Sequence, residues 1–301
     1  MNAVLYVVMV AIWSTTWLAI HVSHGAFSPA WGAALRFVVA ATLMLPLTRP
    51  RKGRAPWGLA VLVGMLGYTF NYTASYGAVS LLPSGTAAMM LSSAPLFTAL
   101  WARILIPGEP LRTSSVVGLM LAVSGVAVVQ KAITLPASGL AAALFYVALG
   151  TQSQALSTVV ARRYGREGVD SVALTARSIL MGTVGLVALA FLREGTPWGM
   201  LGAASREAWG AVVYLAVAGT CVTFTIFYLL VQRLGPILPS TAGVVCPVLA
   251  LLFGAVVGGE PLTAQHGLAA LLTSVGVGMT LLPARMARVP APVNASAPAR
   301  D

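Results

Sequence analysis

Charged residues are scarce in this sequence. Only 8% of its 301 residues are charged, whereas 58% are hydrophobic, and soluble globular domains carry charge on about a quarter of their residues. The composition therefore excludes an ordinary soluble domain and predicts a membrane protein with several spans. Cysteine is also rare, and because Cys221 and Cys246 both fall within apolar stretches, we expect no disulfide between them.

No carboxylate falls in the middle of an apolar stretch. Proton-driven exporters commonly use an intramembrane Asp or Glu as a relay, so this absence argues against proton coupling and against recognition of a cation by a carboxylate. The nearby titratable alternative is His21, which we interpret as an interface residue. The acidic residues fall in predicted loops, at helix ends or in the tail: Glu109, Glu167, Asp170, Glu194, Glu207, Glu260 and Asp301.

Motifs of enzymatic catalysis are missing as well. The sequence contains no H-E-x-x-H, no G-x-S-x-G and no G-x-x-x-x-G-K-[ST], and its three histidines are dispersed. We therefore predict a protein that is not an enzyme and that has no cofactor and no metal site.

Ten apolar stretches are present, each near the roughly 20 residues that a helix needs to cross a hydrocarbon core of about 30 Å. They lack the period-2 alternation of transmembrane β-strands, so the prediction is an all-α membrane protein of ten transmembrane helices. We interpret the first stretch as an uncleaved helix because no basic segment precedes it. The predicted spans are 3–21, 30–48, 56–78, 84–106, 112–130, 138–162, 170–192, 208–232, 237–257 and 264–283.

The net charge of +11 is distributed unevenly along the chain. If the amino terminus is cytoplasmic, the segments on that side hold twelve basic residues and the outer loops hold three, namely Lys131, Arg193 and Arg206. This is the positive-inside pattern, so we expect a multi-pass protein of a bacterial inner membrane with both termini cytoplasmic. The basic charge then reflects topology, and we expect no nucleic-acid partner.

The second half of the sequence repeats the first at a nearly constant offset. Pro95 followed by G-E-P-L at 108–111 recurs as Pro247 followed by G-E-P-L at 259–262, an offset of 152 and then 151 residues. Both prolines fall well inside a predicted span, where a proline removes a backbone hydrogen bond. We predict hinges at Pro95 and Pro247, with a static kink as the alternative for each.

The repeat predicts two units of five helices, at 1–131 and 138–283, followed by a disordered cytoplasmic tail at 284–301. Because five is odd, the second unit starts on the opposite side of the membrane and is inverted, an arrangement typical of transporters with a central cavity and alternating access. Small residues recur at helical spacing on the fifth and tenth spans. We interpret both seams as packing within a monomer, with a dimer contact as the alternative: Ser115, Gly118, Ala122 and Gly125, and Gly267, Ala270, Ser274 and Gly278.

Aromatic and polar residues recur every four residues on the first, third and eighth spans, which places them on one helical face. Amides at membrane depth must find a partner or line water. The alternative is that the aromatic residues lie at the membrane interface or fill helix packing. The candidate substrate-binding residues are Trp17, Asn71, Tyr76, Ser92, Gln152, Thr220 and Tyr228.

Two arginines within predicted spans are repeat mates. Arg36 lies seven residues after Pro29, and Arg177 lies seven residues after Asp170, at an offset of 141. Each is near enough to a helix end to extend its charged head to the interface. We favour a structural role for both, with contact to a substrate carboxylate as the alternative.

Several motifs resemble the EamA repeat of the drug/metabolite transporter superfamily. They include W-S-T-T-W-L-A-I-H at 13–21, L-R-F at 35–37, S-A-P at 93–95 and both G-E-P-L segments. The resemblance implies ten helices in two inverted repeats around a central cavity, and export of small metabolites. Within this superfamily the chain is similar to amino acid exporters of the YddG type, although His21 stands where the family usually has Lys.

We therefore predict an inner-membrane exporter of small metabolites, most consistent with amino acids of broad specificity, that works by alternating access. Neutral hydrogen-bonding groups and aromatic walls suit a zwitterion, and without an intramembrane acid the flux is expected to follow the substrate gradient. One alternative is a multidrug exporter of quaternary ammonium compounds held by cation–π contacts. The other is a channel-like membrane protein without alternating access.

Overall fold

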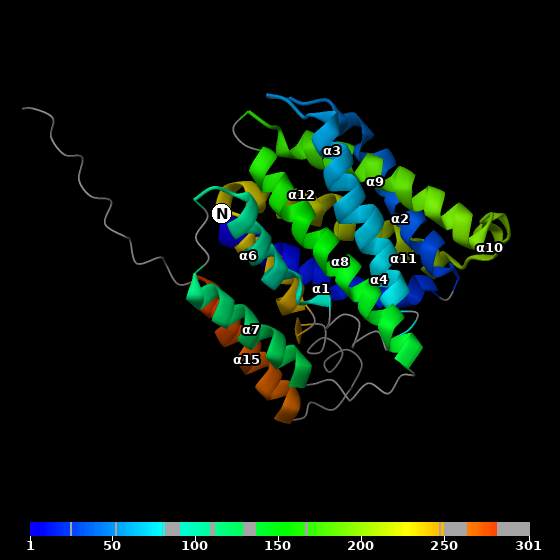
Figure 1. Cartoon of the computed structure of the whole chain (residues 1–301). Coiled ribbons are helices and arrows are strands. Elements are labelled where there is room, and N and C mark those ends of the chain that lie inside the picture. The colour runs from blue at the N-terminus through cyan, green and yellow to red at the C-terminus, as the bar shows by residue number, and fades with distance from the viewer. Residues whose placement is uncertain are drawn as a thin grey trace, which may run out of the picture.

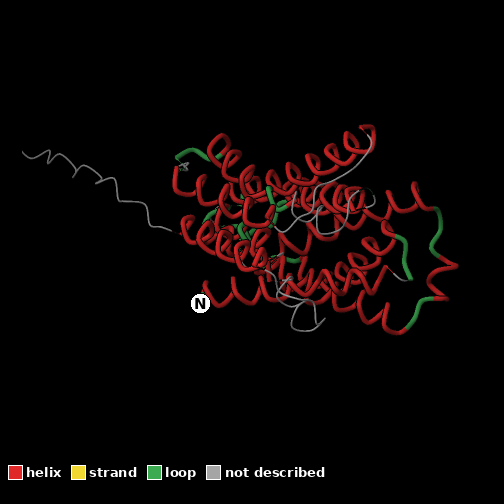
Figure 2. Tube along the Cα trace, turned by 90° about the horizontal axis from the view of Figure 1, so that it is seen from below, coloured by secondary structure: helices red, strands yellow, loops and turns green. Residues whose placement is uncertain are grey.

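The computed structural model describes residues 1–24, 26–51, 53–79, 81, 91–108, 112–128, 137–165, 168–246, 248–249 and 264–281. Within these residues the structure is helical (Figures 1 and 2), and the β-type pairing is limited to an isolated bridge between Arg54 and Val169. Long apolar segments satisfy their backbone groups internally when they form helices, so this result follows from the composition. The prediction of an all-α protein is confirmed for the described residues.

Except for the short α10, which lies between the seventh and eighth predicted spans, the helices follow the predicted spans in order. In the first half they are α1 (Asn2–His24), α2 (Pro29–Met44) with the 3₁₀ turn η1 (Leu45–Thr48), α3 (Trp57–Gly64), η2 (Met65–Phe70), α4 (Asn71–Val79), α6 (Ala94–Leu105) and α7 (Thr113–Val128). In the second half they are α8 (Ala137–Tyr164), α9 (Ser171–Glu194), α10 (Trp198–Ala203), α11 (Arg206–Ala216), η3 (Val217–Val222), α12 (Thr223–Leu234), α13 (Ile237–Ser240) and α15 (Ala264–Leu281).

Three helical segments in the described part of the chain are long and apolar enough to cross a membrane. They are Pro29–Thr48, Ser171–Glu194 and Arg206–Leu234, and they correspond to the second, seventh and eighth predicted spans. Shorter apolar helices occupy Asn2–Thr16, Ala94–Leu105, Thr113–Gly125 and Ile237–Cys246. The total of ten spans stays a prediction.

Helices from the two halves of the sequence pack against each other. α2 lies along α9, and α1 lies against α11 and α12. α8 lies against α3, η2, α4 and α6, while α7 and α15 pair with each other (Figure 1). The largest group of buried apolar side chains is formed by residues of both halves, among them Phe37, Tyr68, Phe224 and Phe227.

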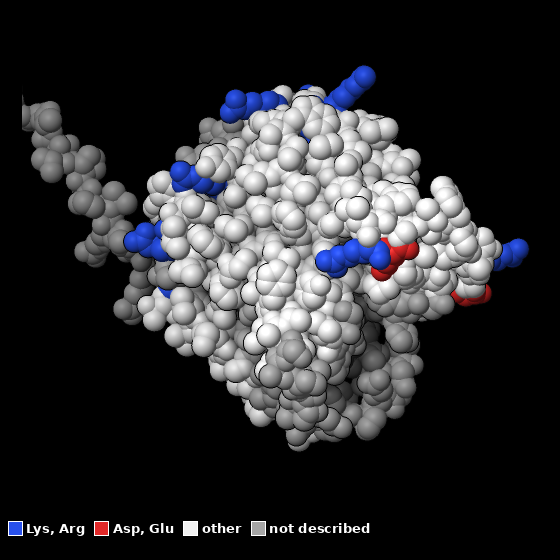
Figure 3. All heavy atoms as spheres, turned by 45° about the vertical axis from the view of Figure 1, so that its right-hand side comes forward, with Lys and Arg blue, Asp and Glu red and all other residues white. Residues whose placement is uncertain are grey.

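The outer surface is apolar over a wide area. Large hydrophobic side chains such as Ile104, Phe145 and Leu192 are exposed. On the face shown in Figure 3, most of the surface carries no charge, and basic side chains gather mainly toward the upper and left-hand edges. A broad uncharged surface of this kind suits contact with lipid, because burial in the bilayer removes it from water.

Carboxylates secure both ends of the α2–α9 pair. Asp170 caps the start of α9, where its Oδ1 accepts hydrogen bonds from the amides of Val172 and Ala173 at 3.0 and 3.1 Å. Glu194, at the end of α9, accepts hydrogen bonds from the first amides of α2, Ala30 at 3.0 Å and Trp31 at 3.1 Å. Negative charge at a helix N-terminus satisfies free amides and complements the helix dipole. α2 and α9 therefore run antiparallel, with Glu194 at one end of the pair and Asp170, which also accepts from Arg51 N at 2.9 Å, at the other.

The packing of α7 against α15 agrees with the predicted seam of small residues on the fifth span and differs from the one predicted on the tenth. A Cβ built at Gly276 would lie 2.3 Å from the Gly118 carbonyl oxygen and 2.8 Å from the Ala122 Cβ. Glycine at 276 is thus what allows these helices to approach, and Gly118 and Ala122 of the fifth-span seam take part as expected. On the tenth span the expected face is wrong, because Gly267 and Gly278 are exposed with nothing within 4 Å of a built Cβ.

Candidate functional site

The third and eighth spans each change from α-helix to π-helix for one turn. The π-turns are η2, Met65–Phe70, and η3, Val217–Val222. The second begins and ends 152 residues after the first, which is the offset between Pro95 and Pro247. A π-turn is rare, and it frees backbone groups and is frequent at functional sites. Two of them in register mark equivalent places in the two halves.

A glycine in each π-turn allows a helix of the other half to approach. A Cβ built at Gly67 would lie 2.5 Å from Ser157 Oγ on α8, and one built at Gly219 would lie 2.9 Å from Thr16 Cγ2 on α1. Gly67 and Gly219 are 152 residues apart, and Thr16 and Ser157 are 141 residues apart. The same contact is therefore made twice, each time between opposite halves.

Polar side chains surround the first π-turn. Ser157 Oγ lies 2.9 Å from the Tyr228 hydroxyl and donates to the Val63 carbonyl at 3.2 Å. Asn71 Nδ2 donates to Gln154 Oε1 at 3.0 Å. Four polar side chains from α4, α8 and α12 thus meet beside η2, and each has a protein partner. Asn71, for which a partner at membrane depth was predicted, finds one in Gln154.

Arg36 lies beside the second π-turn and is only 2% exposed. Its Nε donates to Thr220 Oγ1 at 2.9 Å, and its Nη2 donates to the Gly219 carbonyl at 3.0 Å and to the Tyr72 hydroxyl at 3.2 Å. Its guanidinium carbon lies 5.4 Å from the ring centre of Phe37 and 5.1 Å from that of Tyr72. The expectation that Arg36 reaches the membrane interface is wrong, because the side chain is buried among these groups.

The positive charge of Arg36 has no ion-pair partner among the described residues. The described carboxylates lie at helix ends: Asp170 and Glu194 cap α9 and α2, and Glu207 is in the first turn of α11. The hydrogen-bond acceptors of Arg36 are all neutral oxygens. A buried charge without an opposite charge costs several kcal/mol unless other groups compensate for it.

The repeat mate of Arg36 has a different environment. Arg177 Nε donates to the Thr48 carbonyl at 2.7 Å, its Nη1 donates to the Ala55 carbonyl, and its guanidinium carbon lies 4.4 Å from the Trp57 ring centre. These contacts connect α9 to the end of η1 and to the segment between η1 and α3. The contacts of Arg177 fit the predicted structural role, and for Arg36 both the structural role and contact with a ligand stay predictions.

Aromatic rings form a continuous group next to these polar residues. Trp13 lies 5.4 Å from Phe224 between ring centres, and Phe224 lies 4.8 Å from Tyr68 in an edge-to-face arrangement. The Tyr68 ring is 5.2 Å from Phe37, which in turn is 4.8 Å from Tyr72. Part of the predicted aromatic stripes therefore fills helix packing, as the alternative interpretation stated.

The predicted site residues do not all gather in one place. Thr220 contacts Arg36, and Asn71 and Tyr228 lie beside η2. Gln152 instead accepts a hydrogen bond from Trp101 Nε1 at 2.6 Å, between α8 and α6, and Ser92 Oγ donates to the Gly243 carbonyl at 2.9 Å, a contact between the two halves. Tyr76 is half-buried on α4. The side chain of Trp17 lies outside the described residues.

The prediction for the hinge prolines is changed in one respect. The fourth span is interrupted by a turn at Ser92 and Ser93, and Pro95 occupies the first turn of α6. At that position a proline breaks no helical hydrogen bond, because the first amides of a helix have no partner within it. Pro95 therefore follows an interruption and does not kink a continuous helix. Pro247 lies outside the described residues.

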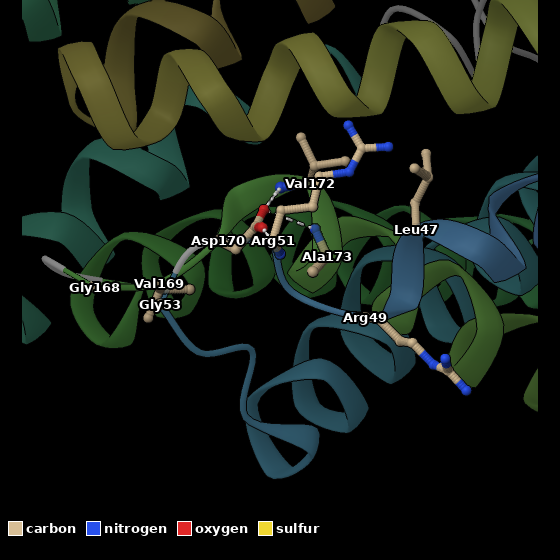
Figure 4. A pocket seen from close by; sticks show the side chains of 9 residues that line it. All are labelled: Leu47, Arg49, Arg51, Gly53, Gly168, Val169, Asp170, Val172 and Ala173. Carbon is tan, nitrogen blue, oxygen red and sulfur yellow. Dashed lines mark hydrogen bonds between the residues drawn. The ribbon is translucent and has the colours of Figure 1, made fainter.

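A separate hollow of about 500 Å³ lies where the segment after η1 meets the start of α9 (Figure 4). Arg54 N donates to the Gly168 carbonyl at 2.7 Å, and Asp170 N donates to the Arg54 carbonyl at 3.0 Å. Figure 4 shows Asp170 directed toward the amides of Val172 and Ala173, so its carboxylate is occupied. The residues that line the hollow are Leu47, Arg49, Arg51, Gly53, Gly168, Val169, Asp170, Val172 and Ala173.

Sequence reasoning missed the π-turns, their glycines, Ser157 and the buried position of Arg36. A comparison of the two halves at both offsets would have paired Gly67 with Gly219 and Thr16 with Ser157. It would not have shown the π-turns, because their hydrogen-bond shift has no simple residue signature.

The apolar helices, their packing between the halves and the wide apolar surface are features of a membrane protein. The chain belongs to the EamA-like transporter family, whose match covers residues 1–130 and 141–282. The two matched segments correspond closely to the two repeat units at 1–131 and 138–283, whose inverted relation stays a prediction.

Three relatives are similar over most of their length. The uncharacterized inner membrane transporter YedA of Escherichia coli (strain K12) is 28% identical, over 95% of this chain and 94% of the relative. An uncharacterized transporter of Archaeoglobus fulgidus is 27% identical, over 91% and 93%, and Protein PecM of Dickeya dadantii is 26% identical, over 81% and 80%. One solved crystal structure superposes with a TM-score of 0.78 over 93% of this chain and 96% of the other; at 22% identity it supports the fold alone.

Proposed function

We propose that this protein exports small metabolites, chiefly amino acids with broad specificity, across a bacterial inner membrane by alternating access. In this proposal ten helices form two inverted five-helix repeats around a central cavity. Relatives named as inner membrane transporters support the location.

The observation that carries the proposal is the pair of π-turns in register. Each π-turn contacts the first helix of the opposite half: η3 contacts α1, and η2 contacts α8. Two further pairings, α2 with α9 and α7 with α15, join equivalent helices of the two halves. An exchange of the halves leaves this set of contacts unchanged, as expected for inverted repeats that move against each other about a common axis.

The chemistry near the π-turns supports a zwitterionic substrate. Thr220, Asn71 and Tyr228 offer neutral hydrogen-bonding groups, and aromatic rings lie next to them. The buried positive charge of Arg36 disfavours a quaternary ammonium substrate, because like charges repel strongly in a medium of low dielectric constant. Amino acids therefore fit this environment better than the hydrophobic cations.

The test is counterflow into proteoliposomes that contain the purified protein and excess unlabelled amino acid. Radiolabelled amino acids outside the vesicles are expected to accumulate, because a carrier exchanges substrate across the membrane. The panel should include an apolar, an aromatic, a hydroxylated and an acidic amino acid, with protein-free vesicles as the control. No accumulation of any member would refute amino acid transport.

A further inference from the structure

We infer that Arg36 binds the carboxylate of the transported substrate, with the hydroxyl of Tyr72 as a second donor, so that substrates of this protein must carry a carboxylate. The inference rests on the proposed function in one respect only: it assumes that the polar residues beside η3 bind the transported molecule. It applies to amino acids and equally to carboxylates that have no amino group.

The first reason is the charge itself. A guanidinium group keeps its proton under all physiological conditions, so Arg36 cannot become neutral when it is buried. Its partners among the described residues are two hydroxyls and one carbonyl, and these solvate the charge without neutralising it. An anion that enters would supply the opposite charge, and this gain favours binding of an anion over binding of a neutral analogue.

The second reason is the number of donors that remain. A guanidinium has five N–H groups. The single N–H of Nε and the two of Nη2 are taken by Thr220, Gly219 and Tyr72. The two N–H groups of Nη1 have no partner among the described residues, and the Tyr72 oxygen accepts from Arg36 while its own O–H has no described acceptor. Three donors are therefore left for a carboxylate, which has two acceptor oxygens.

The third reason is that the arginine is held rigidly. Thr220 Oγ1 in η3 donates to the carbonyl of Leu215, five residues earlier in α11, at 2.9 Å, and this bond orients its lone pairs toward Arg36 Nε. The Gly219 carbonyl accepts from Arg36 Nη2 and also from Thr223 Oγ1 at 2.8 Å. The π-turn thus fixes two of the three guanidinium nitrogens, and a donor fixed in advance loses little entropy when a ligand binds.

Arg177 provides a matched comparison within the same chain. It occupies the equivalent position in the second half, but it donates to the backbone carbonyls of Thr48 and Ala55 and lies over the Trp57 ring. Those contacts hold a chain segment in place. A charge change at Arg177 should therefore affect stability without affecting the choice between an acid and its amide.

The test measures binding to the purified full-length protein in detergent by calorimetry. The probes are L-phenylalanine, L-phenylalaninamide and 3-phenylpropanoate, for the wild type and for Arg36→Gln, with Arg177→Gln as the control. Hydrogen bonds that involve a charged group are worth roughly 10- to 100-fold in affinity. The wild type and Arg177→Gln are expected to bind the two acids by about that factor more tightly than the amide, and Arg36→Gln is expected to lose the preference.

Equal affinity of the wild type for acid and amide would overturn the inference. Failure of both acids to bind, or an unchanged preference in Arg36→Gln, would overturn it as well.

Two further variants serve if Arg36→Gln does not fold. Arg36→Lys keeps the charge with fewer donors, and Tyr72→Phe removes one donor, so both should weaken the preference for the acids in part. Binding of 3-phenylpropanoate without binding or counterflow of amino acids would support the carboxylate site and refute the amino acid proposal. Failure of the carboxylate site and failure of the amino acid proposal are therefore distinguishable.

Discussion

Arg36 and Arg177 illustrate how little a residue's place in a repeat says about its role. Both lie seven residues after the start of their span, yet Arg36 is buried beside η3 and Arg177 connects α9 to the segment before α3. The difference comes from what each side chain can reach. Arg36 meets a carbonyl in a π-turn and two hydroxyls, and Arg177 meets two backbone carbonyls and the face of an indole ring.

The contacts of Arg177 predict a loss of stability when it is truncated. Arg177→Ala removes two hydrogen bonds to backbone carbonyls and a cation–π contact, a loss of about 2 to 4 kcal/mol in the free energy of unfolding. We expect a lower midpoint of thermal unfolding in detergent. Arg193→Ala is the control, because Arg193 is exposed and its loss should change the midpoint little. Equal midpoints for the two variants would contradict the role assigned to Arg177.

The π-turns are elements at which helices of the two halves approach closely. An α-helix has no room for an extra residue without a local bulge, and the bulge leaves backbone carbonyls that need other donors. At η3 these donors include Arg36 Nη2 and Trp13 Nε1, both of which reach the Gly219 carbonyl. The glycine in each turn then removes the Cβ that would separate the helices.

This geometry predicts a specific coupling between Gly67 and Ser157. Gly67→Ala places a methyl group 2.5 Å from Ser157 Oγ, closer than atoms can approach, so the variant should be destabilised by about 1 to 3 kcal/mol. Ser157→Ala removes that oxygen, and the double variant should recover part of the loss. Thermal unfolding of the four proteins of the cycle gives the coupling energy.

Gly210→Ala is the matched control for the backbone effect of alanine, because nothing lies within 4 Å of a Cβ built there and the residue is also helical. It should be neutral or slightly stabilising. Additive losses in the Gly67 and Ser157 cycle would show that the two residues do not limit how closely η2 and α8 approach.

At the scale of the whole molecule, the α2–α9 pair has polar contacts at both ends. Glu194 holds the start of α2, and Asp170 accepts a hydrogen bond from Arg51 N at 2.9 Å beyond the end of η1. This pair is therefore expected to move as one body. Because α2 and α9 come from opposite halves, movement would then involve the remaining helices of each half, at places such as the contact of Ser92 with Gly243 and the interruption before α6.

Alternating access predicts that single cysteines at Tyr76 and Tyr228 are never accessible from both sides at once. The background requires replacement of Cys221 and Cys246. In the presence of substrate, a membrane-impermeant maleimide should label each cysteine from one side of the membrane, or bound substrate should protect the cysteine from labelling. In the absence of substrate, labelling should proceed from the opposite side. Labelling of both positions from both sides under one condition would indicate a channel.

The sequence by itself determined the class of this protein. Low charge and long apolar stretches leave a helical membrane protein as the available fold, since only helices satisfy the backbone within each such segment. The internal offset of 151 to 152 residues and the G-E-P-L segments pointed to the two matched repeat segments of a transporter family. These features are local or periodic, and they can be seen without knowledge of any long-range contact.

The tertiary structure alone decided which residues meet. Arg36 and its partner Thr220 are 184 residues apart, and Asn71 and Gln154 are 83 residues apart. Gln152 was predicted for the same site but reaches Trp101, because neighbouring positions on a helix point in different directions. Burial of a charge and the supply of its hydrogen bonds depend on several helices at once, and therefore no pattern within a single span could specify them.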